Sequence, residues 1–296
     1  MIFRPNALIF ARSTNFTSRG VYLMRKILSA LLVLALFAGI ASAEGRKVGI
    51  LSKLNMSQEE YTDFIAAGRK AGAWNFFSSK PKDDPVSFVF YDTLQAMQLA
   101  LNAGEIDEAA LPEVVAEYVM NVTGAYNISS IAKTRPSFLA FGFRAGSSDE
   151  LLKQFNDAIL SMKEDGTLAV LQAKYIYDAG IGDPESVEFR KFGNVDKKLT
   201  IAVTGDLPPI DYVTADGKAA GFNTAVIAEI GRRLQVNVEL IQVMSGARAS
   251  AVVSGRADAV FWIQGHRDVP RHSDIPEGIA LSEPYYEWNE YLFLSR

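Results

Sequence analysis

One pattern occurs twice in this chain and constrains its fold more than any other feature. Residues 91–111 and residues 243–262 each read as a strand, a helix, a glycine, an acidic residue and a second strand. Alternating strands and helices predict a parallel or mixed sheet with helices on both faces. Because the unit occurs twice, we expect an α/β protein with two similar lobes rather than an array of many short tandem repeats. Ligands of such sheets bind beyond the carboxyl ends of the strands.

Further elements extend these two units. Apolar runs and helical periodicity in the first half predict strands at 47–51, 87–91 and 137–143, an extended segment at 106–111, and helices at 93–103 (ended by Gly104), 112–121, 149–161 and 166–175. The second half is predicted to hold strands at 199–203, 236–242, 257–262 and 291–294, and helices at 223–234 and 247–253. Ser57 and Glu60 have the spacing of a helix capping box.

Composition excludes several classes of site. The chain has no cysteine, which excludes disulfides, thiolate catalysis, cysteine-ligated zinc and a lipid-modified cysteine. It has only two histidines, His266 and His272, so a histidine-rich metal site is excluded and we expect no metal and no cofactor. The formal net charge of −4 gives no electrostatic case for a nucleic-acid partner.

Residues 24–43 have the pattern of a cleavable secretion signal. Arg25 and Lys26 precede an apolar run over 28–40, and the small residues at 41–43 fit a cleavage site. The apolar run is too short for a comfortable membrane span. An N-terminal anchor helix or a buried core helix is the alternative. We therefore expect residues 1–43 to lie outside the fold, with Met24 as the true start or a long leader before it.

Several segments resemble the bacterial extracellular solute-binding proteins of family 3, which bind polar amino acids for uptake transporters. Those in the second half are TGDLPPIDYVTADGKAAGFNTAVIAEIGRRL (204–234), SGRADAVFW (254–262) and LSEPYYEWNEYLFLS (281–295). Those in the first half are KVGILSKLNMSQEEY (47–61), FLAFGFRAGSSDELLKQFNDAI (138–159) and MKEDGTLAVLQAKY (162–175). The resemblance implies two α/β lobes with mixed sheets joined by two hinge strands, the type II periplasmic binding fold.

The order of these segments is reversed relative to the family. Residues 46–144 resemble its second lobe, 145–177 its closing helices that pack on the other lobe, and 199–296 its first lobe plus a hinge strand. Residues 178–198, rich in charge, glycine and proline, would be the linker. A circular permutation explains this order, and it is tolerated where the original termini lie close together. Two partial copies or a domain-swapped dimer are the alternatives.

The resemblance places part of a ligand site in the second half. Asp206, Pro208 and Pro209 follow the strand whose loop lines the cleft in the family, and Asp211 and Tyr212 could add charge and stacking. In the family, a Ser-Gly pair follows a strand that contains the sequence Asp-Ala-Val. In this chain that pair is absent, and Trp262 and Gln264 stand in its place. Trp262 would stack on a ligand or pack in the core. Arg267 and Arg271 lie near the family's carboxylate-binding arginine, and no spacing decides between them.

Arg248 is a further candidate for a carboxylate clamp. It opens a predicted helix directly after a strand, at the edge of the expected cleft. The backbone amides of such a position favour an anion, and a guanidinium matches both oxygens of a carboxylate. An exposed arginine in a first helical turn would be slightly unfavourable, which favours a functional role.

The first half supplies the other candidates. Asn55 and Ser57 match the family's carboxylate-holding helix start, although capping alone would explain Ser57. Glu113 falls near its amine-binding aspartate, where an acidic side chain is also favoured for helix capping. Tyr91 and Tyr286 are expected at the cleft or in the core.

Three functions follow from the resemblance. The first is extracytoplasmic capture of a small polar solute, an amino acid, for delivery to an ABC-type membrane permease. The second is a periplasmic enzyme on the same fold, similar to cyclohexadienyl dehydratase, which would need an acid–base pair in the cleft. The third is a sensor or orphan ligand-binding module. The sequence contains no nucleophile–base set, phosphate loop or metal cluster, so we expect no enzyme activity.

Overall fold

The structure, a computed structural model, describes residues 45–53, 56–63, 86–181, 186–193, 198–266 and 274–296. The predicted leader at 1–43 lies outside the described residues. Within the described part of the chain, no helix combines the length and the apolar character that crossing a membrane requires.

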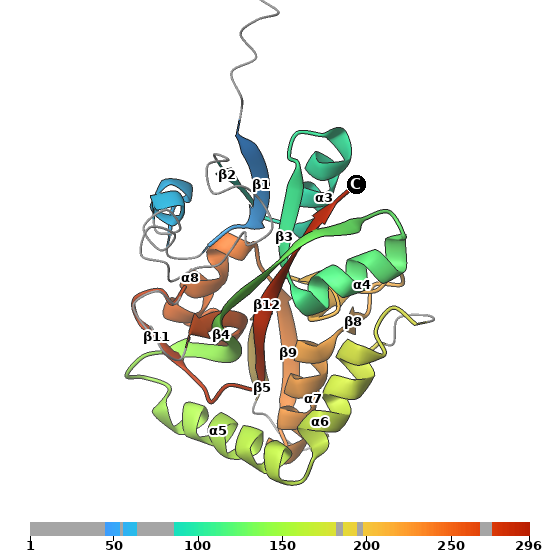
Figure 1. Cartoon of the computed structure of the whole chain (residues 1–296). Helices are drawn as coiled ribbons and strands as arrows, with labels where there is room; N and C mark the ends of the chain where they lie inside the picture. Colours follow the sequence, from blue (N-terminus) through green and yellow to red (C-terminus); the bar gives the residue numbers. More distant parts are fainter. Residues whose placement is uncertain (1–44, 54–55, 64–85, 182–185, 194–197, 267–273) are drawn as a thin grey trace, which may run out of the picture. The chain divides into compact units, whose positions relative to one another are not determined.

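The first lobe is built on three parallel strands. β1 (Arg46–Leu51) lies between β2 (Val86–Tyr91) and β3 (Glu108–Pro112) and is parallel to both. Two helices, α3 (Leu94–Ala103) and α4 (Glu113–Thr123), pack against them (Figure 1). Because parallel strands point the same way, Ser52, Asp92 and Glu113 all follow strand ends at one edge of the sheet.

Local sequence signals explain where the helices of this lobe begin and end. The Thr93 hydroxyl oxygen accepts a hydrogen bond from the Ala96 amide at 3.1 Å and so caps the start of α3. Gly104 ends α3 in the left-handed conformation, at a φ of 75°. The predicted capping box is confirmed, since the Ser57 amide donates to Glu60 Oε2 at 2.8 Å and the Glu60 amide donates to Ser57 Oγ at 3.2 Å.

The second lobe repeats the parallel core. β5 (Lys198–Val203) lies between β9 (Asn237–Gln242) and β10 (Ala259–His266) and is parallel to both. Helix α7 (Phe222–Leu234) precedes β9, and a short 3-10 turn (Ser245–Ala247) leads into α8 (Arg248–Val253). β5 and β9 therefore end just before Thr204 and Val243, at the edge where the repeated pattern predicts a site.

Two smaller features of this lobe were not predicted from the sequence. A three-stranded sheet of β6 (Asp206–Leu207), β7 (Asp211–Val213) and β8 (Ala219–Ala220) follows β5. β11 (Ile279–Leu281) pairs with the end of β4. These strands are two or three residues long, which is too short for an alternating pattern to stand out.

Two long strands join the lobes. β4 (Asn127–Arg144) and β12 (Tyr286–Ser295) run antiparallel to each other (Figure 1). At one end β12 also pairs with β3 of the first lobe, and at the other end β4 pairs with β10 of the second lobe. Among the described residues, nine strands thereby form one continuous sheet.

The predicted strands 137–143 and 291–294 were too short, since β4 begins at Asn127 and β12 at Tyr286. The register of the two strands shifts between Trp288 and Glu290, opposite a stretch of β4 that contains Pro136. Proline within a strand is accommodated at such irregularities. The first part of β4 was not predicted from the sequence because its residues are polar and include a proline. The crossing between the lobes lies at this irregularity, because β4 pairs with β10 from Ser137 onward and β12 pairs with β3 from Tyr291 onward.

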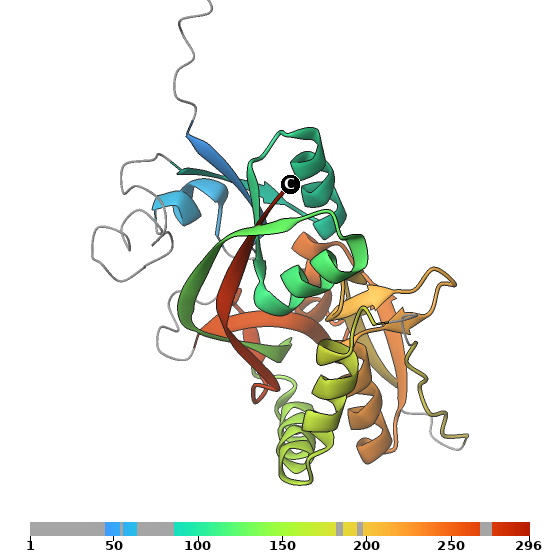
Figure 2. The same cartoon turned by 45° about the vertical axis from the view of Figure 1, so that its right-hand side comes forward.

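Three helical segments follow β4 and pack on the second lobe. They are α5 (Asp149–Glu164), α6 (Thr167–Gln172) and a π-helical turn (Ala173–Tyr177). In Figure 2, α5 and α6 lie beside α7. Arg233, at the end of α7, holds them, because its guanidinium donates to Ser161 Oγ at 2.6 Å and to Asp165 Oδ2 at 2.7 Å. The described residues of the segment 178–198 form turns and irregular chain, apart from one isolated bridge between Ser186 and Ala220 and from Lys198, which begins β5.

The first and last strands end close to each other. β1 begins and β12 ends at the same end of the sheet, with only β3 between them. The Arg296 guanidinium donates to the Asn102 carbonyl oxygen at 2.7 Å, at the end of α3.

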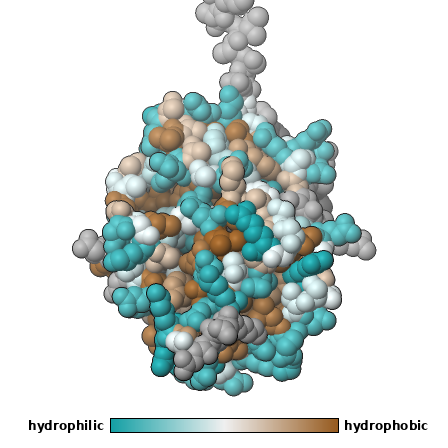
Figure 3. Space-filling model, turned by 180° about the vertical axis from the view of Figure 1, so that it is seen from behind, coloured by the Kyte–Doolittle hydropathy of each residue, from teal (hydrophilic) through white to brown (hydrophobic). Residues whose placement is uncertain are grey.

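The face of the molecule in Figure 3 carries mainly polar side chains around a central apolar patch, a mixture that is ordinary for protein surfaces.

Candidate functional site

A cleft lies where the strand ends of the two lobes meet. From the first lobe, Asp92 and Thr93 follow β2 and line it. From the second lobe, Thr204 and Asp206 follow β5, and the segment 242–245 comprises the last residue of β9 and the three residues after it. These are the carboxyl ends of parallel strands in both lobes, the position at which α/β sheets bind their ligands.

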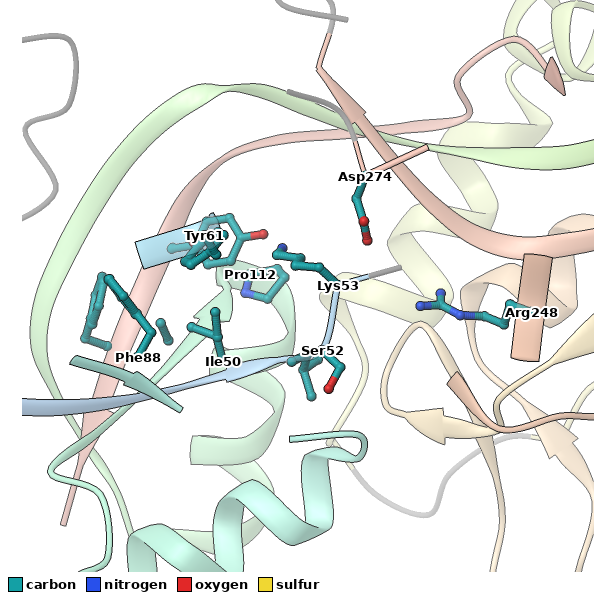
Figure 4. A pocket seen from close by; sticks show the side chains of 12 residues that line it. Ile50, Ser52, Lys53, Tyr61, Phe88, Pro112, Arg248 and Asp274 are labelled. Carbon is teal, nitrogen blue, oxygen red and sulfur yellow. The ribbon is translucent and has the colours of Figure 1, made fainter. Parts of the chain in front are cut away.

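A second cavity adjoins this cleft (Figure 4). Its charged and polar lining consists of Ser52, Lys53, Tyr61, Arg248, Asp274 and Tyr291. Apolar side chains make the rest of its wall, namely Ile50, Leu51, Phe88, Ala110, Pro112 and Phe293.

Two hydrogen bonds connect the cavity with the cleft. The Ser52 hydroxyl donates to Asp92 Oδ1 at 2.8 Å in the first lobe, and Arg248 Nη2 donates to Ser245 Oγ at 3.1 Å in the second. In each pair one residue lines the cavity and the other lines the cleft. We treat the two spaces together as the candidate site.

Arg248 enters this site from the second lobe. Its side chain is 2 % exposed, and Nε also donates to the Ser245 carbonyl oxygen at 3.1 Å, which fixes the direction of the guanidinium. Burial lowers the pKa of Arg248 to about 10, and the nearby charges of Asp274, Asp206 and Asp211 oppose that shift. The guanidinium is therefore protonated at neutral pH and lines a space that two lobes share.

Lys53 enters the same cavity from the first lobe, two residues after β1. Its ammonium group lies 5.6 Å from the centre of the Tyr61 ring, a cation–π distance. Burial lowers the pKa of Lys53, but Tyr291, Tyr61 and Asp274 together raise it above its ordinary value. Lys53 and Asp274 were not predicted from the sequence. A lysine directly after a buried strand was the available signal, but many solvated lysines occupy such positions.

Asp211 and Asp206 stand near Arg248 and differ in their surroundings. The Asp211 side chain is buried and accepts hydrogen bonds from the amides of Thr204 and Gly205 at 3.1 and 3.2 Å. Burial raises the pKa of Asp211 to about 6, against the effect of these hydrogen bonds. Asp211 therefore braces the loop after β5, whereas Asp206 lines the cleft itself.

Pro209 and Tyr212 do not appear among the described residues that line the cleft or the cavity. Pro209 is buried, and its carbonyl oxygen accepts from the Phe222 amide at 3.0 Å at the start of α7. Gly221 permits this packing, because its φ is 98° and a Cβ there would lie 2.6 Å from the Ile210 carbonyl oxygen. The Tyr212 ring lies 6.2 Å from that of Tyr118, a contact between the two lobes.

Glu113 and Tyr286 lie near each other beside this contact. Burial, together with Glu117 and Glu290, raises the pKa of the Glu113 carboxyl. Burial also raises the pKa of Tyr286, as do the charges of Tyr177, Glu113 and Glu117. Tyr286 is buried, and its ring packs edge-on against Phe222. Tyr91 is half-buried and packs against the main core.

The described part of the structure places none of the remaining candidate residues in the site. Ser57 is exposed and engaged in its capping box. Asn55, Arg267 and Arg271 lie outside the described residues. Trp262 and Gln264 belong to β10, but their side chains also lie outside what the structure describes. Their predicted roles stay predictions.

The described groups suit binding of a charged small molecule. Among the described residues, no set of three or more carboxylate or imidazole side chains is arranged to hold a metal ion. Two cations, one carboxylate and several hydroxyls face a shared space with apolar walls. Such a space can hold an anionic or zwitterionic ligand and orient it through a few polar contacts.

Residues 199–293 match the model of the bacterial extracellular solute-binding proteins, family 3. None of the curated proteins matches the chain.

Solved structures with similar arrangements include three binding proteins. One is the zinc-bound ligand-binding component of an ABC-type import system from Staphylococcus aureus (10 % identity, TM-score 0.39, covering 85 % of this chain and 65 % of that one). Another is the periplasmic aliphatic sulphonate binding protein SsuA from Escherichia coli (11 %, 0.38, 84 % and 64 %). A third is an ancestral amino acid-binding protein, AncCDT-1, a precursor of cyclohexadienyl dehydratase (12 %, 0.41, 85 % and 81 %). The chain thus spans just under two thirds of the length of the first two.

Proposed function

We propose that this chain, whose residues 199–293 belong to the bacterial extracellular solute-binding proteins of family 3, captures an amino acid in the cleft between its lobes. The observation that carries the proposal is Arg248, a buried guanidinium that lines a cavity to which both lobes contribute. A guanidinium in this position would hold the α-carboxylate of the ligand through two parallel hydrogen bonds.

Closure about a hinge supports the same function. The lobes are joined by two strands, β4 and β12, whose pairing is irregular between Trp288 and Glu290. Hinges of this kind are a few residues that absorb the backbone change while the lobes move as rigid bodies. The lobes already touch at Tyr118 and Tyr212, whose ring centres lie 6.2 Å apart.

We infer that the lobe order arose by circular permutation. The start of β1 and the end of β12 lie at the same end of the sheet on either side of β3, so a short connection would join them. The segment 178–198 then connects the two positions at which the chains of the family begin and end. This proximity supports a permutation more than two partial copies, because the segments together supply one set of lobes.

The cellular role is part of the proposal. A leader with the pattern of residues 24–43 would direct the chain out of the cytoplasm. Because the chain contains no cysteine, it cannot carry a lipid anchor attached to cysteine. The expected partner is an ABC-type permease in the membrane, to which the closed, loaded form delivers its ligand without chemical conversion.

A thermal-shift measurement of the purified protein tests the proposed function. The probes are the twenty common amino acids, putrescine as a diamine, and prephenate. A ligand present at a hundred times its Kd stabilises the folded state by about 2.7 kcal/mol. For a protein of this size, that corresponds to an increase in Tm of about 5–10 °C. We expect this increase with at least one amino acid.

The outcome also separates binding from catalysis. An amino acid that raises the Tm and is recovered unchanged supports a binding protein. Failure of every amino acid to raise the Tm would contradict the proposal. Consumption of prephenate over time would identify the chain as an enzyme of the dehydratase type instead.

A further inference from the structure

Lys53 is the charged group of the site that capture of an α-carboxylate does not explain. Among the described residues, its ammonium makes no hydrogen bond or ion pair; the Tyr61 ring lies 5.6 Å away, and Asp274 and Tyr291 are near enough to raise its pKa. Figure 4 shows Lys53 directed toward Tyr61, while Arg248 enters the cavity from the opposite side. The two cations therefore offer an anion two separate anchor points.

The surroundings keep Lys53 protonated. Its side chain is half-buried and shares the cavity with Ile50, Phe88 and Phe293, which are packed in the second apolar core of the first lobe. Burial lowers the pKa of Lys53, but the nearby Tyr291, Tyr61 and Asp274 outweigh it and raise the pKa above its ordinary value. The ammonium therefore presents a positive charge to the cavity at neutral pH.

The charged groups of the cavity indicate what Lys53 binds. Among the described residues that line it, the cations are Lys53 and Arg248, and the single carboxylate is that of Asp274. A neutral amino acid bears one carboxylate and one ammonium, so its carboxylate at Arg248 would leave Lys53 without a ligand group. A ligand with a second acidic group would contact both cations.

Resting on the proposed function, we propose that Lys53 binds a second acidic group, so that the ligand is an acidic amino acid with carboxylates at both Arg248 and Lys53. Asp274 and the neighbouring Asp206 then face the ligand ammonium from the second lobe. The apolar wall of Ile50 and Pro112 accommodates the methylene groups between the two carboxylates.

Isothermal titration with matched pairs of ligands tests this assignment. The probes are L-glutamate and L-aspartate, each compared with its amide, together with glutarate as a diacid without an ammonium. Hydrogen bonds to charged groups contribute about 1.5–3 kcal/mol, so we expect the acid to bind about 10- to 100-fold more tightly than its amide. Lys53→Met should abolish that preference, because the second carboxylate of the acid loses its cationic partner.

Lys133→Met is the matched control. Lys133 lies in β4 with its side chain 80 % exposed, in an ion pair with Glu290. This variant should keep the full preference for the acid.

Equal binding of acid and amide by the unmodified protein would overturn the assignment of Lys53 and leave amino-acid capture standing. So would a preference for the acid that survives Lys53→Met. If neutral and acidic amino acids alike fail to bind, the proposed function fails as well.

Discussion

Replacing Arg248 with methionine is expected to lower the affinity for an amino acid by about 30-fold or more, because truncating one partner of a buried charged hydrogen bond costs about 2–5 kcal/mol. The guanidinium is 2 % exposed and is directed by two hydrogen bonds to Ser245. Its removal takes away the partner of the ligand carboxylate and the cation that offsets the nearby charges of Asp206 and Asp274. Isothermal titration with the amino acid that most raises the Tm measures the loss.

A variant that does not fold would also fail to bind, so a second substitution is needed. Arg248→Lys keeps the charge and most of the volume but lacks the planar fork, so we expect a folded protein with intermediate affinity. Arg233→Met is the control in the same lobe, since Arg233 bonds Ser161 and Asp165 on the closing helices and does not line the cavity. Full affinity in folded Arg248→Lys and Arg248→Met proteins would remove Arg248 from the site.

Replacing Arg46 with methionine is expected to lower the free energy of unfolding by about 3–5 kcal/mol, the usual cost of breaking a buried ion pair. Arg46 Nη1 lies 2.9 Å from Glu108 Oε2, and the two side chains are 8 % and 2 % exposed. The Ser129 hydroxyl donates to Glu108 Oε1 at 2.6 Å, so the carboxylate joins β1, β3 and β4. Without Arg46, that carboxylate stays buried next to an apolar side chain. Urea denaturation measures the change.

A double variant separates the charge from the packing. Adding Glu108→Gln to Arg46→Met removes the uncompensated charge, so the double variant should regain part of the lost stability. Lys153→Met is the control, because the Lys153–Asp157 pair on α5 is 69 % and 62 % exposed and should contribute at most about 0.5 kcal/mol. If Arg46→Met costs no more than Lys153→Met, the ion pair does not hold the first lobe together.

The fold could be predicted from sequence wherever one local signal was sufficient. The Ser57 capping box and the end of α3 at Gly104 are each set by neighbouring residues, and both are confirmed. The early part of β4 was missed because its residues are polar and include Pro136. Its strand conformation depends on pairing with β12, about 160 residues away along the chain, which no local pattern reveals.

The site was predicted less completely than the fold. Arg248 was identified because a cation at a helix start after a strand is unusual, and the structure places it on the cavity wall. Lys53 and Asp274 were missed because their importance arises only when the two lobes face each other. Asp211 was predicted to meet the ligand, and its carboxylate instead accepts hydrogen bonds from the loop after β5.

A crystal structure of the protein with the amino acid that most raises its Tm tests the central claim most directly. The account predicts the ligand between the lobes, with its α-carboxylate within hydrogen-bonding distance of Arg248 and its side chain toward Lys53. Electron density for the ligand on the outer surface of either lobe, away from Arg248 and the cleft beside Asp206, would contradict it.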